Sequence, residues 1–154
     1  MANATRRTNA KRRSTIPLTS VESAARYLCA IRDDEDQLTL GRLERLLYYA
    51  QGIALAVHGQ PLFANPIIAT ANGPIIVEVE RLYAGQIGVL AADYGFDVFS
   101  LPAQARAALE RAYVNYGQYA TWWLREKMRS ESPWQMTAQG AEISHEALAA
   151  FFAG

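Results

Sequence analysis

The sequence has little of what disulfide scaffolds, membrane spans and secreted proteins require. It contains one cysteine in 154 residues, so an internal disulfide is excluded, and the natural compartment of such a chain is a reducing cytoplasm. No apolar run approaches the roughly 18 residues of a membrane helix, and no signal peptide is visible at the first apolar stretch. We therefore expect a cytoplasmic protein without membrane contact.

The parts of a catalytic or cofactor site are also missing from the sequence. His58 and His145 fall in different predicted helices, and they have no metal-ligand spacing with each other or with Cys29. The glycines never have the spacing of a dinucleotide-binding or phosphate-binding loop. Residues 33–36 are four consecutive acids, but they lack the glycine and the following glutamate of a calcium loop, which favours a solvated loop. We predict no enzyme activity, no cofactor and no metal.

What the sequence does have is an uneven distribution of charge. Five basic side chains and no acid stand at the start of the chain, at Arg6, Arg7, Lys11, Arg12 and Arg13. Residues 14–154 carry 10 basic and 15 acidic side chains, a formal charge of −5. Residues 1–15 show no apolar periodicity, so we predict a basic arm ahead of a domain formed by residues 16–154. Either the arm is simply solvated, or it makes weak nucleic-acid contacts without sequence preference.

The apolar residues predict one helical domain. They make up 51% of the chain, and we expect a single compact, mainly α-helical domain with a central two-sided helix and at most a short β element. Thr19 and Glu22 have the spacing of a capping box, which predicts a first helix of about three turns. A helix over about residues 102–128 follows later, then a break at residues 132–134 and a final short helix capped by Ser144.

The segment after the central helix is ambiguous in its periodicity. Residues 67–69 predict a short strand, and residues 72–73 are an Asn-Gly turn. Pro74 suits the first position of a helix over about residues 75–83, whereas the alternation of apolar and acidic residues there favours a strand. We predict the helix and keep the strand as the alternative. Residues 84–100 form a long connection of the kind that often carries function.

The most strongly patterned stretch is residues 40–58, with Thr39 as the predicted N-cap and Gly59 as the end. One face carries apolar residues at helical spacing, namely Leu40, Leu43, Leu46, Leu47, Ala50, Ile53, Ala54 and Val57. The opposite face carries Gly41, Glu44, Arg45, Tyr48, Gly52 and Leu55. Each glycine costs about 1 kcal/mol relative to alanine inside a helix, so a close contact must compensate. We predict a helix covered on two sides, the second side by its own domain or by a partner.

The order of motifs in and after this helix resembles the SocA-like antitoxin domain, also called Panacea. The family signature reads basic-Leu-Gln-basic-Leu-x-Tyr-Tyr-Ala-Gln, and residues 42–51 read Arg-Leu-Glu-Arg-Leu-Leu-Tyr-Tyr-Ala-Gln. Further matches follow in the family's order, at Gly59, residues 61–63, 66–67, Ala69, 73–74, Glu78, Leu82, Tyr83, 133–134, 143–144 and 151–152. The resemblance covers about residues 21–152. The chain departs from it with arginines where lysines are common, at Arg42 and Arg45, with Glu44 where glutamine is common, and with Met128-Arg129 where Thr-His is common.

The resemblance implies an antitoxin that neutralises a protein toxin by binding it, with a protease as a further partner if neutralisation works by delivery. The alternative class is a DNA-binding regulator that uses the basic arm. Three Trp and eight Tyr are a generous supply of residues that concentrate binding energy at interfaces. The residues predicted to bind the partner are Arg42, Arg45, Tyr48, Tyr49, Gln51, Asn72, Gly73, Pro74 and Trp134.

Overall fold

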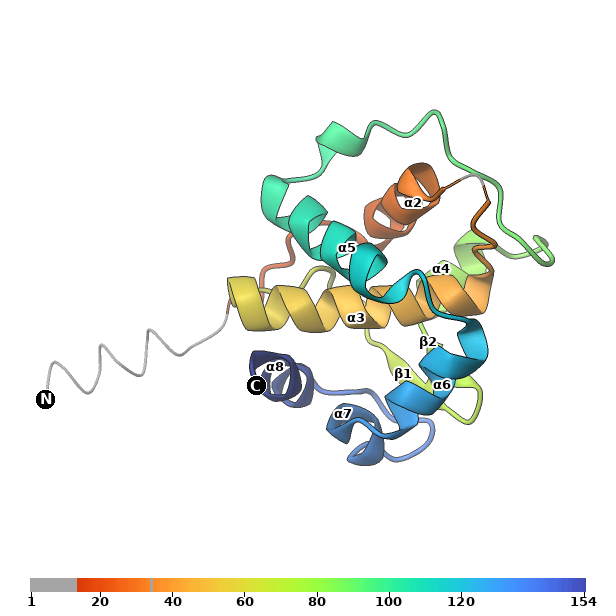
Figure 1. Cartoon of the computed structure of the whole chain (residues 1–154). Coiled ribbons are helices and arrows are strands. Elements are labelled where there is room, and N and C mark those ends of the chain that lie inside the picture. Colours follow the sequence, from red (N-terminus) through yellow and green to blue (C-terminus); the bar gives the residue numbers. More distant parts are fainter. Residues whose placement is uncertain (1–13, 34) are drawn as a thin grey trace, which may run out of the picture.

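The computed structural model describes residues 14–33 and 35–154, and it confirms the mainly helical prediction (Figure 1). Its helices are α2 (Val21–Ile31), α3 (Leu40–His58), α4 (Val77–Leu82), α5 (Ala103–Tyr116), α6 (Thr121–Arg129), α7 (Ser132–Gln135) and α8 (His145–Ala153). Strands β1 (Ile68–Thr70) and β2 (Gly73–Ile75) form an antiparallel hairpin, and η1 (Val98–Ser100) is a 3-10 turn. The predicted nucleic-acid residues Arg6, Arg7, Lys11, Arg12 and Arg13 lie outside the described residues.

Helix α3 is the centre of the fold, as predicted. It packs against α5 on one side and α8 on the other, and it also contacts β2, α2 and α6 (Figure 1). Every residue from Leu43 to Leu55 is buried, whichever way it faces, so the helix has no solvent side along most of its length. Val57 is the exception to the predicted apolar face, because it lies in the last turn and is 55% exposed.

The two internal glycines of α3 mark close contacts. A Cβ atom at Gly52 would stand 2.2 Å from the Phe152 ring of α8, and one at Gly41 would stand 3.0 Å from the Arg45 guanidinium. Glycine is therefore required at position 52 for α8 to approach α3. The close contacts that were predicted to offset the helix-propensity cost of these glycines are therefore made within the same chain.

The helix ends follow local capping chemistry. Thr39 Oγ1 accepts a hydrogen bond from Arg42 N, and Gly59 ends α3 with a φ of 67°, both as predicted. The first helix differs from its prediction, because Ser20 rather than Thr19 is the N-cap and accepts from Ser23 N at 3.0 Å. The backbone of Thr19 is instead bonded to the loop after α3, because its N–H donates to Leu62 O at 2.9 Å.

The predicted helix over residues 75–83 begins later than expected. Pro74 lies in β2, opposite Ala69, and α4 starts at Val77. The helix cannot begin at Pro74, because pairing with β1 keeps residues 73–75 extended. The helix prediction is confirmed from Val77 onward, and of the residues whose alternation favoured a strand only Ile75 lies in one.

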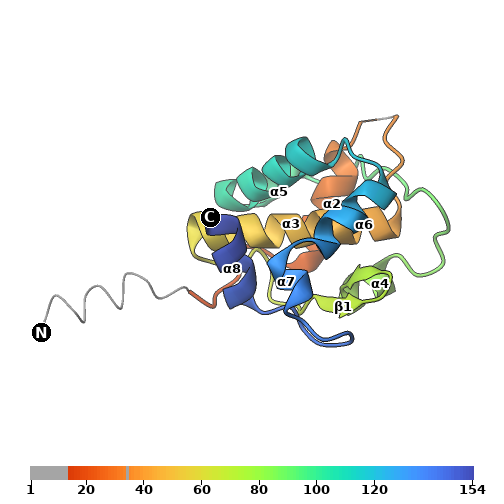
Figure 2. The same ribbon diagram turned by 60° about the horizontal axis from the view of Figure 1, so that its bottom comes forward.

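The long helix predicted over residues 102–128 is two helices. Helix α5 ends at Tyr116 and α6 begins at Thr121, with Ala120 O accepting the first hydrogen bonds of α6. The break redirects the chain, so that α6 and the short α7 lie beside the hairpin and on the other side of α3 from α5 (Figure 1). Figure 2 shows α5 and α7 on opposite sides of α3. The apolar stripe continues across the break, which is why periodicity alone did not reveal it.

Candidate functional site

The polar side chains of α3 point inward, and each holds a different segment of the chain. Gln51 is 1% exposed and fixes the loop after α3. Its Oε1 accepts from Leu62 N at 2.7 Å and Phe63 N at 3.3 Å, and its Nε2 donates to Phe63 O at 3.0 Å. These bonds satisfy backbone groups that the loop buries against the helix.

Tyr48 and Tyr49 hold the junction between α6 and α7. Their hydroxyl groups donate to the buried carboxylate of Glu131, at 3.2 Å from Tyr48 and at 3.2 and 3.3 Å from Tyr49. Lys127 pairs with the same carboxylate, and its ammonium lies 5.4 Å from the ring centroids of Tyr49 and Tyr116. Burial, together with the Glu131 charge, raises the pKa of both tyrosines, so their protons stay in place as donors.

Glu44 and Arg45 hold the segment that contains the hairpin and the start of α4. Glu44 Oε2 accepts from Ile76 N at 2.9 Å, and burial raises the Glu44 pKa to about 8. Arg45 is 6% exposed. Its Nη1 donates to Gly41 O at 2.9 Å and its Nη2 to Asn72 O at 2.7 Å, which pins the hairpin turn to α3.

These contacts correct the interpretation of α3 as a helix with an accessible partner-binding face. Arg45, Tyr48, Tyr49 and Gln51 are interior residues, because α5, α8, the hairpin and the α6–α7 junction cover the second side of the helix. The two internal glycines on that face were the sequence signal for this arrangement. Arg42 is largely buried too, and it pairs with Asp36 at 3.6 Å.

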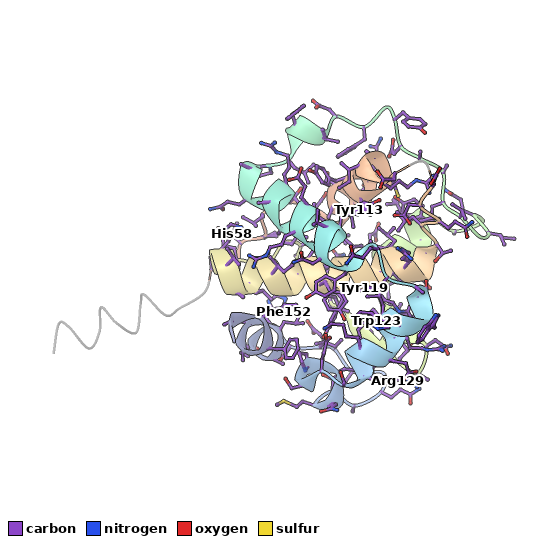
Figure 3. The ribbon with its side chains drawn as sticks, in the orientation of Figure 1. His58, Tyr113, Tyr119, Trp123, Arg129 and Phe152 are labelled. Carbon is purple, nitrogen blue, oxygen red and sulfur yellow. The ribbon has the colours of Figure 1, made fainter. Side chains whose placement is uncertain are left out.

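The remaining predicted residues meet at one surface, which we call the hairpin surface. It consists of the turn at Asn72, the exposed side chains of Arg125 and Arg129 on α6, and the half-buried Trp134 of α7. Arg129 Nη2 donates to Ala71 O at 3.3 Å, and Arg129 lies at the outer edge of the molecule (Figure 3). Gly73 and Pro74 are buried beneath the turn and support it.

Two adjoining hollows give the hairpin surface its shape. A cavity of about 180 Å³ is lined by Thr70, Ala71, Arg129, Trp134, Thr137 and Gln139. A smaller recess beside it is lined by Arg45, Gly73, Arg125 and Met128 together with Ala71, Arg129 and Trp134. From the predicted set, Arg45, Gly73 and Trp134 line the smaller recess, and Asn72 is joined to them through the bond from Arg45 to its carbonyl oxygen. Sequence reasoning missed Arg125, which carries no motif, and noted Arg129 only as a departure from the family pattern.

A separate groove of about 880 Å³ lies between the end of α2, the loop that follows it and α5. The lining of the groove includes one arginine, Arg42, and four acids, Asp33, Glu35, Asp36 and Glu110. Tyr113 donates its hydroxyl to Asp36 Oδ2 at 2.8 Å, and burial raises the Tyr113 pKa to about 12. This groove contains only Arg42 of the predicted partner-binding residues.

The described residues contain no second centre suited to metal or thiol chemistry. Across residues 14–33 and 35–154, no three His, Cys, Asp or Glu side chains are grouped so that they could hold a metal ion. Cys29 is buried, lies 3.5 Å from the Tyr83 hydroxyl, and has a pKa raised by burial. In the described part of the chain, no helix combines the length and the apolar character needed to cross a membrane.

Comparison with known proteins gives one match. The family model described as "Antitoxin SocA-like, Panacea domain" matches residues 43–135, a stretch that runs from the first turn of α3 to the end of α7. No curated protein and no solved structure matches the chain. The matched stretch includes the inward-pointing residues of α3 and most of the hairpin surface, whose cavity extends beyond it to Thr137 and Gln139.

Proposed function

The chain belongs to the SocA-like antitoxins with a Panacea domain, and on that premise we propose that it neutralises a cognate protein toxin by binding it through the hairpin surface. Direct binding needs only a complementary surface, which suits a chain whose sequence offers no catalytic constellation.

One observation carries the choice of surface. The buried polar residues of the family signature hold the hairpin turn and the α6–α7 junction in fixed positions beside each other, through Arg45 to Asn72 O and through Tyr48 and Tyr49 to Glu131. A surface fixed before binding loses less conformational entropy when a partner docks. The signature thereby supports the binding surface from beneath, without touching the partner.

The composition of the hairpin surface also favours a protein partner. It presents a tryptophan and two arginines beside a cavity, and these residue types dominate the energetics of protein interfaces. The acidic groove at α5 offers no tryptophan and only one arginine. The hairpin surface is therefore the better candidate for an interface core.

The test is co-expression with the toxin encoded by the neighbouring reading frame. Trp134→Ala should weaken toxin affinity by about thirtyfold, equivalent to about 2 kcal/mol, and should abolish protection at low expression. Trp122→Ala is the matched control, because Trp122 is a tryptophan of α6 that is 62% exposed and does not line either hollow. Thermal unfolding of both variants separates lost binding from lost folding.

Two results would oppose the proposal. If the toxin kills equally with and without the wild-type chain, the antitoxin role is wrong. If both tryptophan variants protect as well as the wild type and bind the toxin equally, the hairpin surface is not the interface.

A further inference from the structure

We propose that the hairpin surface binds a carboxylate side chain in an acidic segment of the partner protein. The inference rests on the proposed function, and it adds the chemistry of the group that the surface recognises. It starts from a cluster of three arginines that the carboxylates of the described chain neutralise only in part.

Three guanidinium groups, those of Arg45, Arg125 and Arg129, line the smaller recess. Arg45 is buried, and its two terminal nitrogens donate to the carbonyl oxygens of Gly41 and Asn72, which are neutral acceptors. Its Nε is buried and has no hydrogen-bond partner among the described atoms. Burial and the nearby charge of Arg125 lower the Arg45 pKa, as expected for a cation without an adequate counter-charge.

The nearest acids compensate this cluster poorly. Glu44 is next to Arg45 in sequence, but its pKa of about 8 keeps most of its carboxyl groups protonated at neutral pH. Glu126 lies 3.9 Å from Arg125 Nε and 3.7 Å from Arg129 Nη1. Charge-assisted hydrogen bonds are shorter, at about 2.7–2.9 Å, so both exposed guanidinium groups keep donors free for a tighter acceptor.

The shape of the cavity suits a single carboxylate side chain better than a nucleic-acid backbone. The cavity of about 180 Å³ has the Trp134 ring as a wall and Thr70, Thr137 and Gln139 as polar lining. A glutamate fits this arrangement, because its methylene groups can pack on the ring while its carboxylate meets the planar fork of Arg129.

A nucleic-acid backbone fits the same site less well. Binding of such a backbone needs a track of cations along many phosphates, whereas the hairpin surface offers the two exposed guanidinium groups of Arg125 and Arg129.

The experiment uses the full chain labelled with ¹⁵N, and acetylated, amidated hexaglutamate as the probe. We expect saturable chemical-shift changes at the Trp134 indole N–H and the Asn72 backbone N–H. Arg129→Gln should weaken the affinity at least tenfold. Arg111→Gln is the matched control, because it removes the same charge from an exposed position on α5 and should leave the affinity unchanged.

Three outcomes overturn the inference: no saturable shift at Trp134, an equal loss in Arg129→Gln and Arg111→Gln, or a hexathymidylate oligonucleotide that binds the same resonances more tightly than hexaglutamate. Its failure is separable from that of the proposed function. If hexaglutamate fails while Trp134→Ala still loses the toxin, only the carboxylate assignment falls. If hexaglutamate binds while Trp134→Ala retains the toxin, the carboxylate site stands and the toxin-binding surface is wrong.

Discussion

Glu44, which stands where the family signature has glutamine, shows how one buried side chain can make stability depend on pH. Its carboxyl group is 3% exposed and accepts the Ile76 N–H, which tethers the start of α4 to α3. Burial raises the Glu44 pKa from about 4.5 to about 8, the backbone bond opposes the rise, and Glu80 adds to it. The folded chain therefore keeps a proton that the unfolded chain releases at lower pH.

The sign of the pH dependence follows from this raised pKa. Between about pH 4.5 and pH 8 the folded chain holds more protons at Glu44 than the unfolded chain does. The free energy of unfolding therefore has its full contribution from protonated Glu44 below about pH 4.5 and loses it progressively as the pH rises to about 8. Glu44→Gln keeps the size and the acceptor but cannot ionise, so its melting temperature should exceed that of the wild type by a margin that grows from pH 5 to pH 8. Thermal unfolding across this range measures the margin. Glu35→Gln, in an exposed loop, is the control, and a constant margin for Glu44→Gln would refute the assignment.

Tyr49 tests whether the signature tyrosines act in folding. Tyr49→Phe removes a hydroxyl that donates to the buried Glu131 carboxylate. Removing one hydrogen-bond donor from a buried carboxylate typically costs about 1–3 kcal/mol. We expect that loss in the free energy of unfolding measured with urea. Tyr119→Phe is the control, because the Tyr119 ring stacks on Trp123 near the surface and the stacking survives the change (Figure 3). A normal unfolding curve for Tyr49→Phe combined with weak toxin binding would restore Tyr49 as an interface residue.

At the scale of elements, the packing of α8 on α3 depends on the absence of a side chain at position 52. Gly52→Ala should destabilise the fold by about 1–3 kcal/mol despite the better helix propensity of alanine, because the new methyl group overlaps the Phe152 ring. A double-mutant cycle with Phe152→Ala provides the control. The cost of Gly52→Ala should shrink in the Phe152→Ala background, and an unchanged cost would mean that the ring is not the obstacle.

The elements that the sequence predicts well are those set by local chemistry. The limits of α3 follow from Thr39 and Gly59, and the last helix is capped by Ser144 as expected, with Ser144 Oγ accepting from Ala147 N. The covering of α3 on both sides was also predictable, because Gly41 and Gly52 required close contacts. Which segments cover it was not, since periodicity does not specify a packing partner.

The elements that the sequence misplaced depend on contacts that helical periodicity does not specify. Pro74 fits the start of a helix locally, yet pairing with β1 keeps it in a strand. The break between α5 and α6 lets Tyr116 stack on Tyr49 and brings Glu131 to the tyrosine hydroxyls. For the same reason, the inward direction of the polar residues of α3 was visible only after the covering segments were placed.

At the scale of the whole molecule, the proposed function separates support from recognition. The inner layer consists of α3 with its buried polar residues, and the outer layer is the hairpin surface that this layer positions. The basic arm lies outside the described residues, so its nucleic-acid contact stays a prediction, and so does the division into an arm and one domain. This organisation explains how a partner-binding role can coexist with a signature whose residues are buried.

The most direct test of this account is hydrogen–deuterium exchange of the full chain with and without its cognate toxin. We expect the toxin to slow exchange at residues 70–74 and 125–139, which form and flank the hairpin surface. The α3 amides should change little, because they are already buried and hydrogen-bonded in the free chain. Slowed exchange confined to the acidic groove at α5, with no change at the hairpin turn or α7, would contradict the account.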